Sequence, residues 1–336
     1  MLGVDRSGNL TEDDAVWRWA DVTGTDDPGA LLDWGERMGI DPIVMADAVG
    51  DSDQPKYDDL GDHLAFTIHA PHLADDELGA IEIDCVLLDG LLVTIHSESS
   101  PGIEWARARM RDRPDWRRGP DVLLASVLDV ICRRFVPIVE GLDRVADNLA
   151  LSALTGEDVV ADVTTLRISE ADIRRMLVPL LVALDELAAD EHPLVGDAAR
   201  RRLRDVHDVV ARLIGLLDSA RGVLGDALAA YHGMASHRMA RATTVFTIYA
   251  ALMLPLTFIT GFFGMNFATL PGTHDRTGWI VAVGLMVGSL LISLLVFWRA
   301  GLITPEREER PGTADLLRSA ITAPIRAVGS LAPRRR

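Results

Sequence analysis

Residues 242–274 read ATTVFTIYAALMLPLTFITGFFGMNFATLPGTH and contain no Asp, Glu, Lys or Arg. A second uncharged stretch, residues 277–298, reads TGWIVAVGLMVGSLLISLLVFW. About 20 helical residues cross the hydrocarbon core of a bilayer, and each stretch is long enough to do so. We therefore predict two membrane-spanning helices, at residues 243–263 and 277–298. The alternative is a pair of buried helices in a soluble protein. It is disfavoured because Trp279 and Trp298 lie at the two ends of the second stretch, as interfacial tryptophans do.

The loop between the predicted spans, residues 264–276, is short, so the spans form a hairpin whose outer ends lie on one side of the membrane. Arg238 and Arg241 precede the hairpin, and Arg299 and Arg307 follow it. Basic residues concentrate on the cytoplasmic side of membrane proteins. We therefore expect a multi-pass protein of the cytoplasmic (inner) membrane with both termini in the cytoplasm. The N-terminal sequence MLGVDRSGNLTEDDAV has no signal-peptide pattern, which agrees with this orientation.

Charge and motif content exclude several classes of function. The chain has 336 residues, with 33 basic against 50 acidic side chains, and residues 1–100 hold 23 of the acidic and 4 of the basic ones. A nucleic-acid partner is not expected, because the sequence has no basic footprint. The sequence also lacks P-loop, GxSxG and HExxH motifs, so we expect neither an enzyme nor an ATP-driven pump. The two cysteines, Cys85 and Cys132, are expected to be reduced thiols.

Residues 1–118 predict an α/β domain on the cytosolic side. Strands are expected at 63–69, 80–88 and 91–96, the last two joined by a tight turn at Asp89-Gly90. Helices are expected near residues 28–38 and 103–111.

Long helices follow. We predict a helical hairpin over residues 119–192, with helices at about 121–151 and 157–190, and then a stalk helix over residues 193–242. The stalk has apolar residues spaced alternately three and four apart: Leu203, Val206, Val210, Leu213, Leu217, Ala220, Leu224, Ala227, Tyr231 and Met234. Such a heptad seam predicts self-association of the chain. No proline lies between Pro193 and Pro255, so the stalk is expected to continue into the first span, the alternative being a break at Tyr231–Gly233.

The end of the first span and the residues after it, PLTFITGFFGMNF (255–267) followed by Leu270-Pro271, resemble the CorA metal-ion transporter superfamily. The family's signature is Gly-Met-Asn at the outer end of the first of two C-terminal spans. QPKYDD (54–59) followed by HLAFTI, and LRDVHD (203–208), extend the resemblance along the chain. The resemblance implies a homopentamer with a funnel-shaped cytosolic domain, in which the first span lines the pore. It also implies that Mg²⁺ is both transported and regulatory, with no organic cofactor.

The residues themselves indicate how the pore would work. Mg²⁺ releases its inner water shell reluctantly, so a ring of neutral oxygens can select it by hydrogen bonding to those waters. We predict that Gly264, Met265 and Asn266 form this filter, with the Asn266 amide as the main ligand. Stepping inward along the helix predicts the pore-lining residues: Thr243, Phe246 (or its neighbour Thr247), Ala250, Leu254, Thr257 and Gly261. With one copy from each subunit, Thr257 would form a ring of hydroxyls, and Leu254 and Phe246 would form apolar constrictions. Ordinary helix packing is the alternative for each.

The resemblance further implies a regulatory metal site between subunits. Its stalk ligands would be Asp205 and Asp208, which lie off the heptad seam, and its other ligands would be Asp75 and Asp76. Solvated surface acids are the alternative. A divalent cation between such carboxylates would relieve their repulsion and so shift the conformational balance.

Two departures from the family pattern leave alternatives open. Gly272 stands where many relatives have an acidic residue, and Ala240 and Thr243 differ from common residues at the inner mouth. The alternatives are a Zn²⁺ (or Co²⁺ or Ni²⁺) transporter of the same superfamily, and a membrane-tethered regulatory relative that does not conduct. The cytoplasmic tail, residues 299–336, ends in three arginines, which indicates either contact with membrane lipid or a disordered segment.

Overall fold

The computed structural model describes residues 1–5, 7, 9–11, 15–24, 28–50, 54–74, 77–265 and 278–300. The chain divides into two compact units, Met1–Ala235 and Ser236–Arg336, called here the N-terminal and C-terminal units. Helix α6 (Asp197–Phe263) contains the boundary between them. Each unit is described separately below.

The N-terminal unit is built on one seven-stranded sheet with the strand order β2-β1-β3-β7-β6-β5-β4. Strands β3 and β7 pair in parallel and the other neighbours pair antiparallel. The strands are β1 (Leu2–Val4), β2 (Leu10–Thr11), β3 (Trp17–Thr23), β4 (Lys56–Asp59), β5 (Leu64–Ala74), β6 (Glu77–Leu88) and β7 (Leu91–His96). The three strands predicted from the sequence correspond to β5, β6 and β7. The turn at Asp89-Gly90 is also confirmed: Leu88 pairs with Leu91, and Gly90 adopts the positive φ of +69° that such a turn needs.

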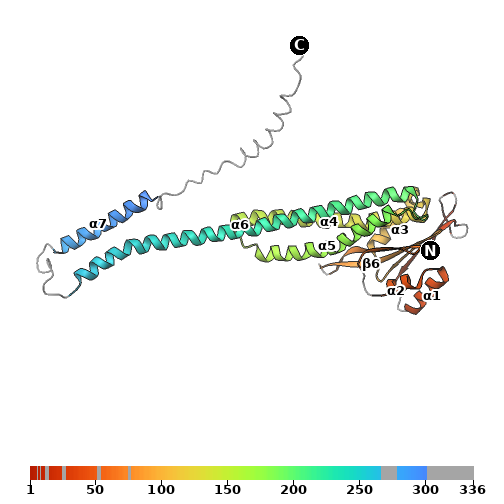
Figure 1. The fold of residues 1–336 in the computed structure, drawn as a ribbon, viewed down its shortest axis with the longest axis horizontal. Coiled ribbons are helices and arrows are strands. Elements are labelled where there is room, and N and C mark those ends of the chain that lie inside the picture. The colour runs from red at the N-terminus through yellow and green to blue at the C-terminus, as the bar shows by residue number, and fades with distance from the viewer. Residues whose placement is uncertain are drawn as a thin grey trace, which may run out of the picture. The chain divides into compact units, whose positions relative to one another are not determined.

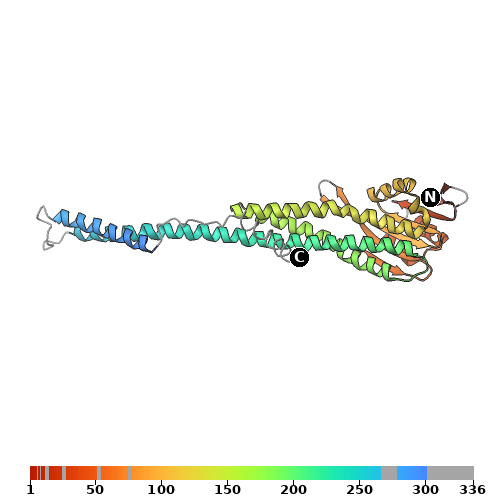
Figure 2. The same ribbon diagram turned by 90° about the horizontal axis from the view of Figure 1, so that it is seen from above.

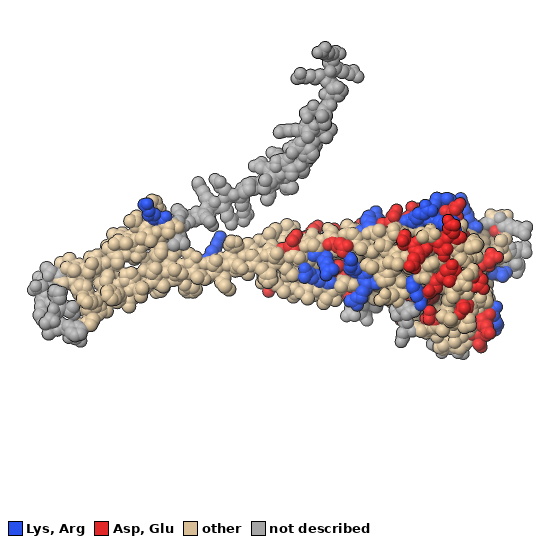
Figure 3. Space-filling model, viewed as in Figure 1, with Lys and Arg blue, Asp and Glu red and all other residues tan. Residues whose placement is uncertain are grey.

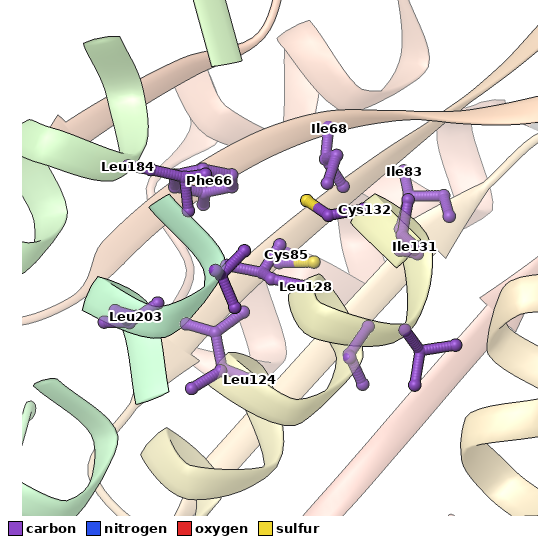
Figure 4. Close-up of a cluster of buried hydrophobic side chains, with 14 of the residues drawn as sticks. Phe66, Ile68, Ile83, Cys85, Leu124, Leu128, Ile131, Cys132, Leu184 and Leu203 are labelled. Carbon is purple, nitrogen blue, oxygen red and sulfur yellow. The ribbon is translucent and has the colours of Figure 1, made fainter. Parts of the chain in front are cut away.

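Helices cover both faces of the sheet (Figure 1). Alternate strand residues point to opposite faces. Phe66, Ile68, Ile83 and Cys85 pack against helix α4 (Pro120–Thr155), which contributes Leu124, Leu128, Ile131 and Cys132 (Figure 4). On the other face, Ala65, Val86, Val93 and Ile95 pack with α1 (Pro28–Met38) and α2 (Pro42–Val49). Both cysteines are buried free thiols.

Three long helices, α4, α5 (Val160–Ala189) and the first part of α6, run side by side over the sheet (Figure 2). The seam residues of α6 from Leu203 to Ala227 are buried, and they pack on α4 and α5 of the same chain. The prediction that this seam drives self-association is therefore wrong, because its apolar face is already covered within one chain. Tyr231 and Met234, the last two seam residues, are only partly buried.

The predicted helices agree with the observed ones, including α3 (Pro101–Asp112) near residues 103–111. Helix α6 also continues through Tyr231–Gly233, so the alternative of a break there is wrong.

The C-terminal unit contains the end of α6 and helix α7 (Gly278–Arg299), which lie alongside each other. Both are long and apolar enough to cross a membrane. Figure 3 shows the contrast in charge: acidic side chains gather on the N-terminal unit, whereas the described part of the C-terminal unit carries none.

Candidate functional site: an uncharged helix face and two stalk carboxylates

The face of α6 predicted to line a pore is open in a single chain. Thr243, Phe246, Ala250, Leu254, Thr257 and Gly261 are all exposed, with 73% of Phe246 and 74% of Leu254 accessible. Residues on the opposite side of the helix, among them Thr244, Ile248 and Leu252, are partly covered. The matching partly covered positions of α7 include Ala282, Met286 and Phe297, which repeat at helical spacing. The hairpin therefore uses one side of α6 to contact α7 and leaves the predicted pore side without a partner in this chain.

The threonine hydroxyls on this face offer uncharged oxygen ligands. Thr243 Oγ1 donates to the Met239 carbonyl and Thr257 Oγ1 donates to the Met253 carbonyl, each over 2.9 Å. A hydroxyl that donates to its own helix keeps its oxygen lone pairs available. Such oxygens can accept hydrogen bonds from the water shell of a hydrated cation.

The end of α6 explains the glycine of the Gly-Met-Asn tripeptide. The Gly264 N–H donates to the Thr260 carbonyl over 2.9 Å, which closes the last turn. A Cβ on residue 264 would lie 2.9 Å from that same carbonyl oxygen, so any other residue would shift the chain at this point. Gly264 and Met265 are both exposed. Asn266, the predicted main filter ligand, lies outside the described residues, as does most of the loop that follows it.

The candidate regulatory carboxylates Asp205 and Asp208 both lie exposed on α6. Asp208 Oδ1 is 3.4 Å from His207 Nδ1. The other two candidates, Asp75 and Asp76, fall outside the described residues. Within the part of the chain that is described, no group of three or more His, Cys, Asp and Glu side chains could hold a metal ion.

Side chains that the sequence did not single out surround Asp205. It borders a cavity of about 200 Å³ together with Asp129, Arg133 and Arg202. Arg133 pairs with Asp129 at 2.7 Å, and Arg202 pairs with Asp115 at 2.5 Å. Burial works against the charge of Asp115, but the hydrogen bond from Arg202, together with the positive charges of Arg202 and Arg113, outweighs it and lowers the pKa of the Asp115 carboxyl. Asp115 and Arg202 are 87 residues apart, so no local sequence pattern links them.

Comparison with known proteins identifies the family. The family model described as CorA-like Mg²⁺ transporter protein matches residues 14–299, which is most of the chain. The chain belongs to the CorA-like family. It is accordingly a divalent cation transporter with two C-terminal membrane helices, and the family is one of transporters rather than enzymes.

The relatives of this CorA-like chain are named as transporters of different metals. YfjQ of Bacillus subtilis is 26% identical over 86% of this chain and 90% of its own length. The cobalt/magnesium transport protein CorA of Thermotoga maritima is 24% identical over 85% of this chain and 83% of its own length. Zinc transport protein ZntB of Yersinia enterocolitica is also 24% identical, over 89% of this chain and 90% of its own length. The comparisons therefore include Mg²⁺, Co²⁺ and Zn²⁺ transporters.

A solved structure supports the fold. The CorA magnesium transporter of Methanocaldococcus jannaschii matches with a TM-score of 0.76 at 22% identity, covering 88% of this chain and 95% of that one. The predicted fold class, an N-terminal α/β domain followed by long helices and a two-span hairpin, is confirmed by this likeness together with the described elements.

Proposed function

We propose that the protein is a homopentameric channel that lets Mg²⁺ enter the cytoplasm passively, with residues 1–242 and 299–336 in the cytoplasm. The observation that carries this proposal is the uncharged face of α6 that ends at Gly264-Met265. It is exposed in one chain, and five copies converging on an axis would bring it to the centre. The relatives named as magnesium transporters support the assignment.

The proposed selectivity rests on the chemistry of the hydrated ion. Mg²⁺ holds its waters tightly, so neutral oxygens that hydrogen-bond to those waters select it without removing them. A ring of Asn266 amides at the outer end and of Thr257 hydroxyls deeper in provides such oxygens. The strongly exposed Leu254 and Phe246 side chains would form apolar constrictions that close by dewetting.

Gating is proposed to follow cytosolic metal. Asp205 and Asp208 are exposed on the stalk, where Asp75 and Asp76 of a neighbouring subunit could meet them. Mg²⁺ bound between subunits would offset carboxylate repulsion and favour the closed state, and its loss would favour opening. We expect Asp205→Asn combined with Asp208→Asn to raise the cytosolic Mg²⁺ concentration needed to stop uptake.

Uptake of Mg²⁺ into cells that lack other Mg²⁺ uptake systems tests the proposed function. The wild-type protein should restore growth at low Mg²⁺, and Asn266→Ala should abolish the rescue. Asn148→Ala is the matched control, because Asn148 is exposed on α4, far along the chain from the filter. No rescue by the wild type, or equal rescue by Asn266→Ala, would contradict the proposal and favour a relative that does not conduct.

Zinc transport is the second candidate. The ZntB relatives support it, as does Gly272, which replaces an acidic residue common in the family's external loop. The intact Gly264-Met265-Asn266 favours Mg²⁺. Ion uptake into liposomes that contain the purified protein separates the two candidates. We expect Mg²⁺ uptake to continue in the presence of micromolar Zn²⁺. Zn²⁺ uptake that excess Mg²⁺ does not reduce would favour the zinc assignment instead.

A further inference from the structure

An arginine-lined groove of about 840 Å³ lies in the N-terminal unit between α3, η1 (Pro114–Arg118) and α4. Ligand-binding pockets commonly have volumes of about 300–1,000 Å³. Apolar side chains make up much of the wall: Pro71, Trp105, Trp116, Val130, Pro137 and Ile138. The charged side chains around them are Arg109, Arg113, Arg133, Arg134 and Arg202, with Asp115 and Asp129.

The arginines of this groove carry more positive charge than the groove itself neutralises. Asp129 is paired with Arg133 at 2.7 Å, and Asp115 with Arg202 at 2.5 Å. The other three arginines, at positions 109, 113 and 134, have no carboxylate within 4.0 Å in the described part of the chain. Guanidinium groups bind phosphate and carboxylate through paired hydrogen bonds. In a chain whose formal net charge is −17, this local excess of positive charge favours an anionic ligand.

An exposed indole lies next to these arginines. Trp105 is 45% accessible although its ring is large and apolar, and the Arg109 guanidinium lies 4.6 Å from the ring centroid. The ring of Trp116, which is buried, lies 6.3 Å from that of Trp105. Indole faces stack on planar bases, and a nearby guanidinium adds a cation–π contribution. The groove therefore offers an aromatic surface and an anion-binding surface together.

We propose that this groove binds a nucleoside polyphosphate, with the base against Trp105 and the phosphates on Arg113 and Arg134. A bare phosphate would leave the apolar wall in contact with water, and an apolar ligand would leave the three unpaired arginines without a counter-charge. A nucleotide satisfies both parts of the groove.

The groove lies beside Asp205, so a ligand bound in it would affect regulation of the channel. This part of the inference rests on the proposed function. Asp129, Arg133 and Arg202 line both this groove and the smaller cavity bordered by Asp205. A polyphosphate bound in the groove would thus be separated only by these shared side chains from Asp205, one of the carboxylates proposed to bind regulatory Mg²⁺. Occupancy of the groove would change the electrostatic environment of Asp205.

Calorimetric titration of the full-length protein, purified in detergent with EDTA present, tests the binding site without any transport readout. The probes are ATP, adenosine and inorganic triphosphate. We expect ATP to bind more tightly than either of the other two. Arg113→Gln and Arg134→Gln should each weaken ATP and triphosphate binding about tenfold or more, since each removes a charge-assisted hydrogen bond to a phosphate.

Two further variants separate the parts of the site. Trp105→Leu should weaken ATP binding and leave triphosphate binding unchanged. Arg118→Gln is the matched control, because Arg118 is an exposed arginine of η1 that does not line the groove. Thermal unfolding of each variant checks that it is folded. If Trp105→Leu does not fold, Arg113→Gln still tests the site, because Arg113 is exposed and its substitution removes no buried side chain.

Four results would overturn the inference while leaving the proposed transport function untouched. The first is no ATP binding at millimolar concentration. The second is triphosphate binding as tight as ATP binding, and the third is an Arg118→Gln effect as large as that of Arg113→Gln. The fourth is a change in oligomer size caused by Arg113→Gln or Arg134→Gln without ATP binding, which would place an acidic segment of a second copy in the groove.

Discussion

At the scale of single residues, His96 carries a charge that its partners dictate. Its Nε2 lies 2.9 Å from Asp21 Oδ1 and its Nδ1 lies 2.6 Å from the backbone carbonyl oxygen of Glu98. Both partners accept hydrogen bonds, so both ring nitrogens donate and the ring is an imidazolium. Burial opposes this charge, but the hydrogen bonds to Asp21 and Glu98 outweigh it and raise the pKa of His96. Arg107 and Thr94 also contact Asp21, and the pKa of Asp21 is lowered.

The raised pKa of His96 predicts how stability depends on pH. A group whose pKa is higher in the folded state stabilises fully below its unfolded pKa, here 6.5, and that contribution is lost as the pH rises through the folded value. We expect the melting temperature of the purified protein to fall as the pH rises from about 6 to 8. His96→Gln should flatten this dependence, and the exposed His237→Gln should preserve it. An unchanged slope in His96→Gln would contradict the assignment of an imidazolium.

Gly264 is the second residue whose identity has a direct structural reason. An alanine Cβ there would lie 2.9 Å from the Thr260 carbonyl oxygen, a contact that has to be relieved by moving the helix end. We expect Gly264→Ala to lower Mg²⁺ uptake severalfold at equal expression. Gly222→Ala, where an added Cβ meets nothing within 4 Å, should transport normally. Equal uptake by both variants would show that the filter tolerates the shift.

At the scale of elements, the packing of α6 on α4 and α5 predicts where the stability of the N-terminal unit resides. Leu213 is fully buried in this packing, and truncating such a leucine to alanine costs about 2–5 kcal/mol. We expect Leu213→Ala to lower the melting temperature by several degrees, independently of protein concentration. Leu151→Ala, on α4 and 63% exposed, is the matched control. If Leu213→Ala instead separated intact subunits, the seam would be an interface between chains after all.

The same elements show what the sequence reveals and what it does not. The Asp89-Gly90 turn and the proline-led helix at residues 28–38 are local signals, and both were predicted correctly. The heptad seam correctly marks a buried face, but its spacing does not say whether the covering helix is α4 of the same chain or a helix of another. Strands β3 and β4 were missed because charged residues interrupt their patterns, as in Lys56–Asp59.

Of the candidate sites, too, one could be predicted from the sequence and one could not. Stepping by helical periodicity from Gly264 gives a set of residues that share one open face, because the helix is unbroken from Thr243 to Gly261 and continues through Pro255. The groove with Trp105 and Arg202 could not be predicted. Its wall includes residues of α3, η1, α4 and α6, and only the tertiary fold brings residues about a hundred positions apart to the same groove.

At the scale of the whole molecule, the separation of charge predicts a membrane orientation. The described residues of the C-terminal unit contain no acidic side chain, and their basic residues are Arg238, Arg241 and Arg299 at the outer ends of the hairpin. These arginines favour the cytoplasmic side. The natural cysteines should not interfere with cysteine labelling. Cys85 and Cys132 are buried, and burial raises the pKa of each thiol, so neither should react with a maleimide in the folded protein.

Single cysteines can therefore report the orientation of the hairpin in intact cells. Thr273→Cys, in the loop proposed to face outward, should react with a membrane-impermeant maleimide added to whole cells. Ser236→Cys, exposed at the other end of the first span, should react only after the cells are permeabilised. Wild-type protein measures the background from the buried cysteines. Labelling of Ser236→Cys in intact cells would reverse the topology and place the acidic N-terminal unit outside, where its carboxylates could not sense cytosolic Mg²⁺.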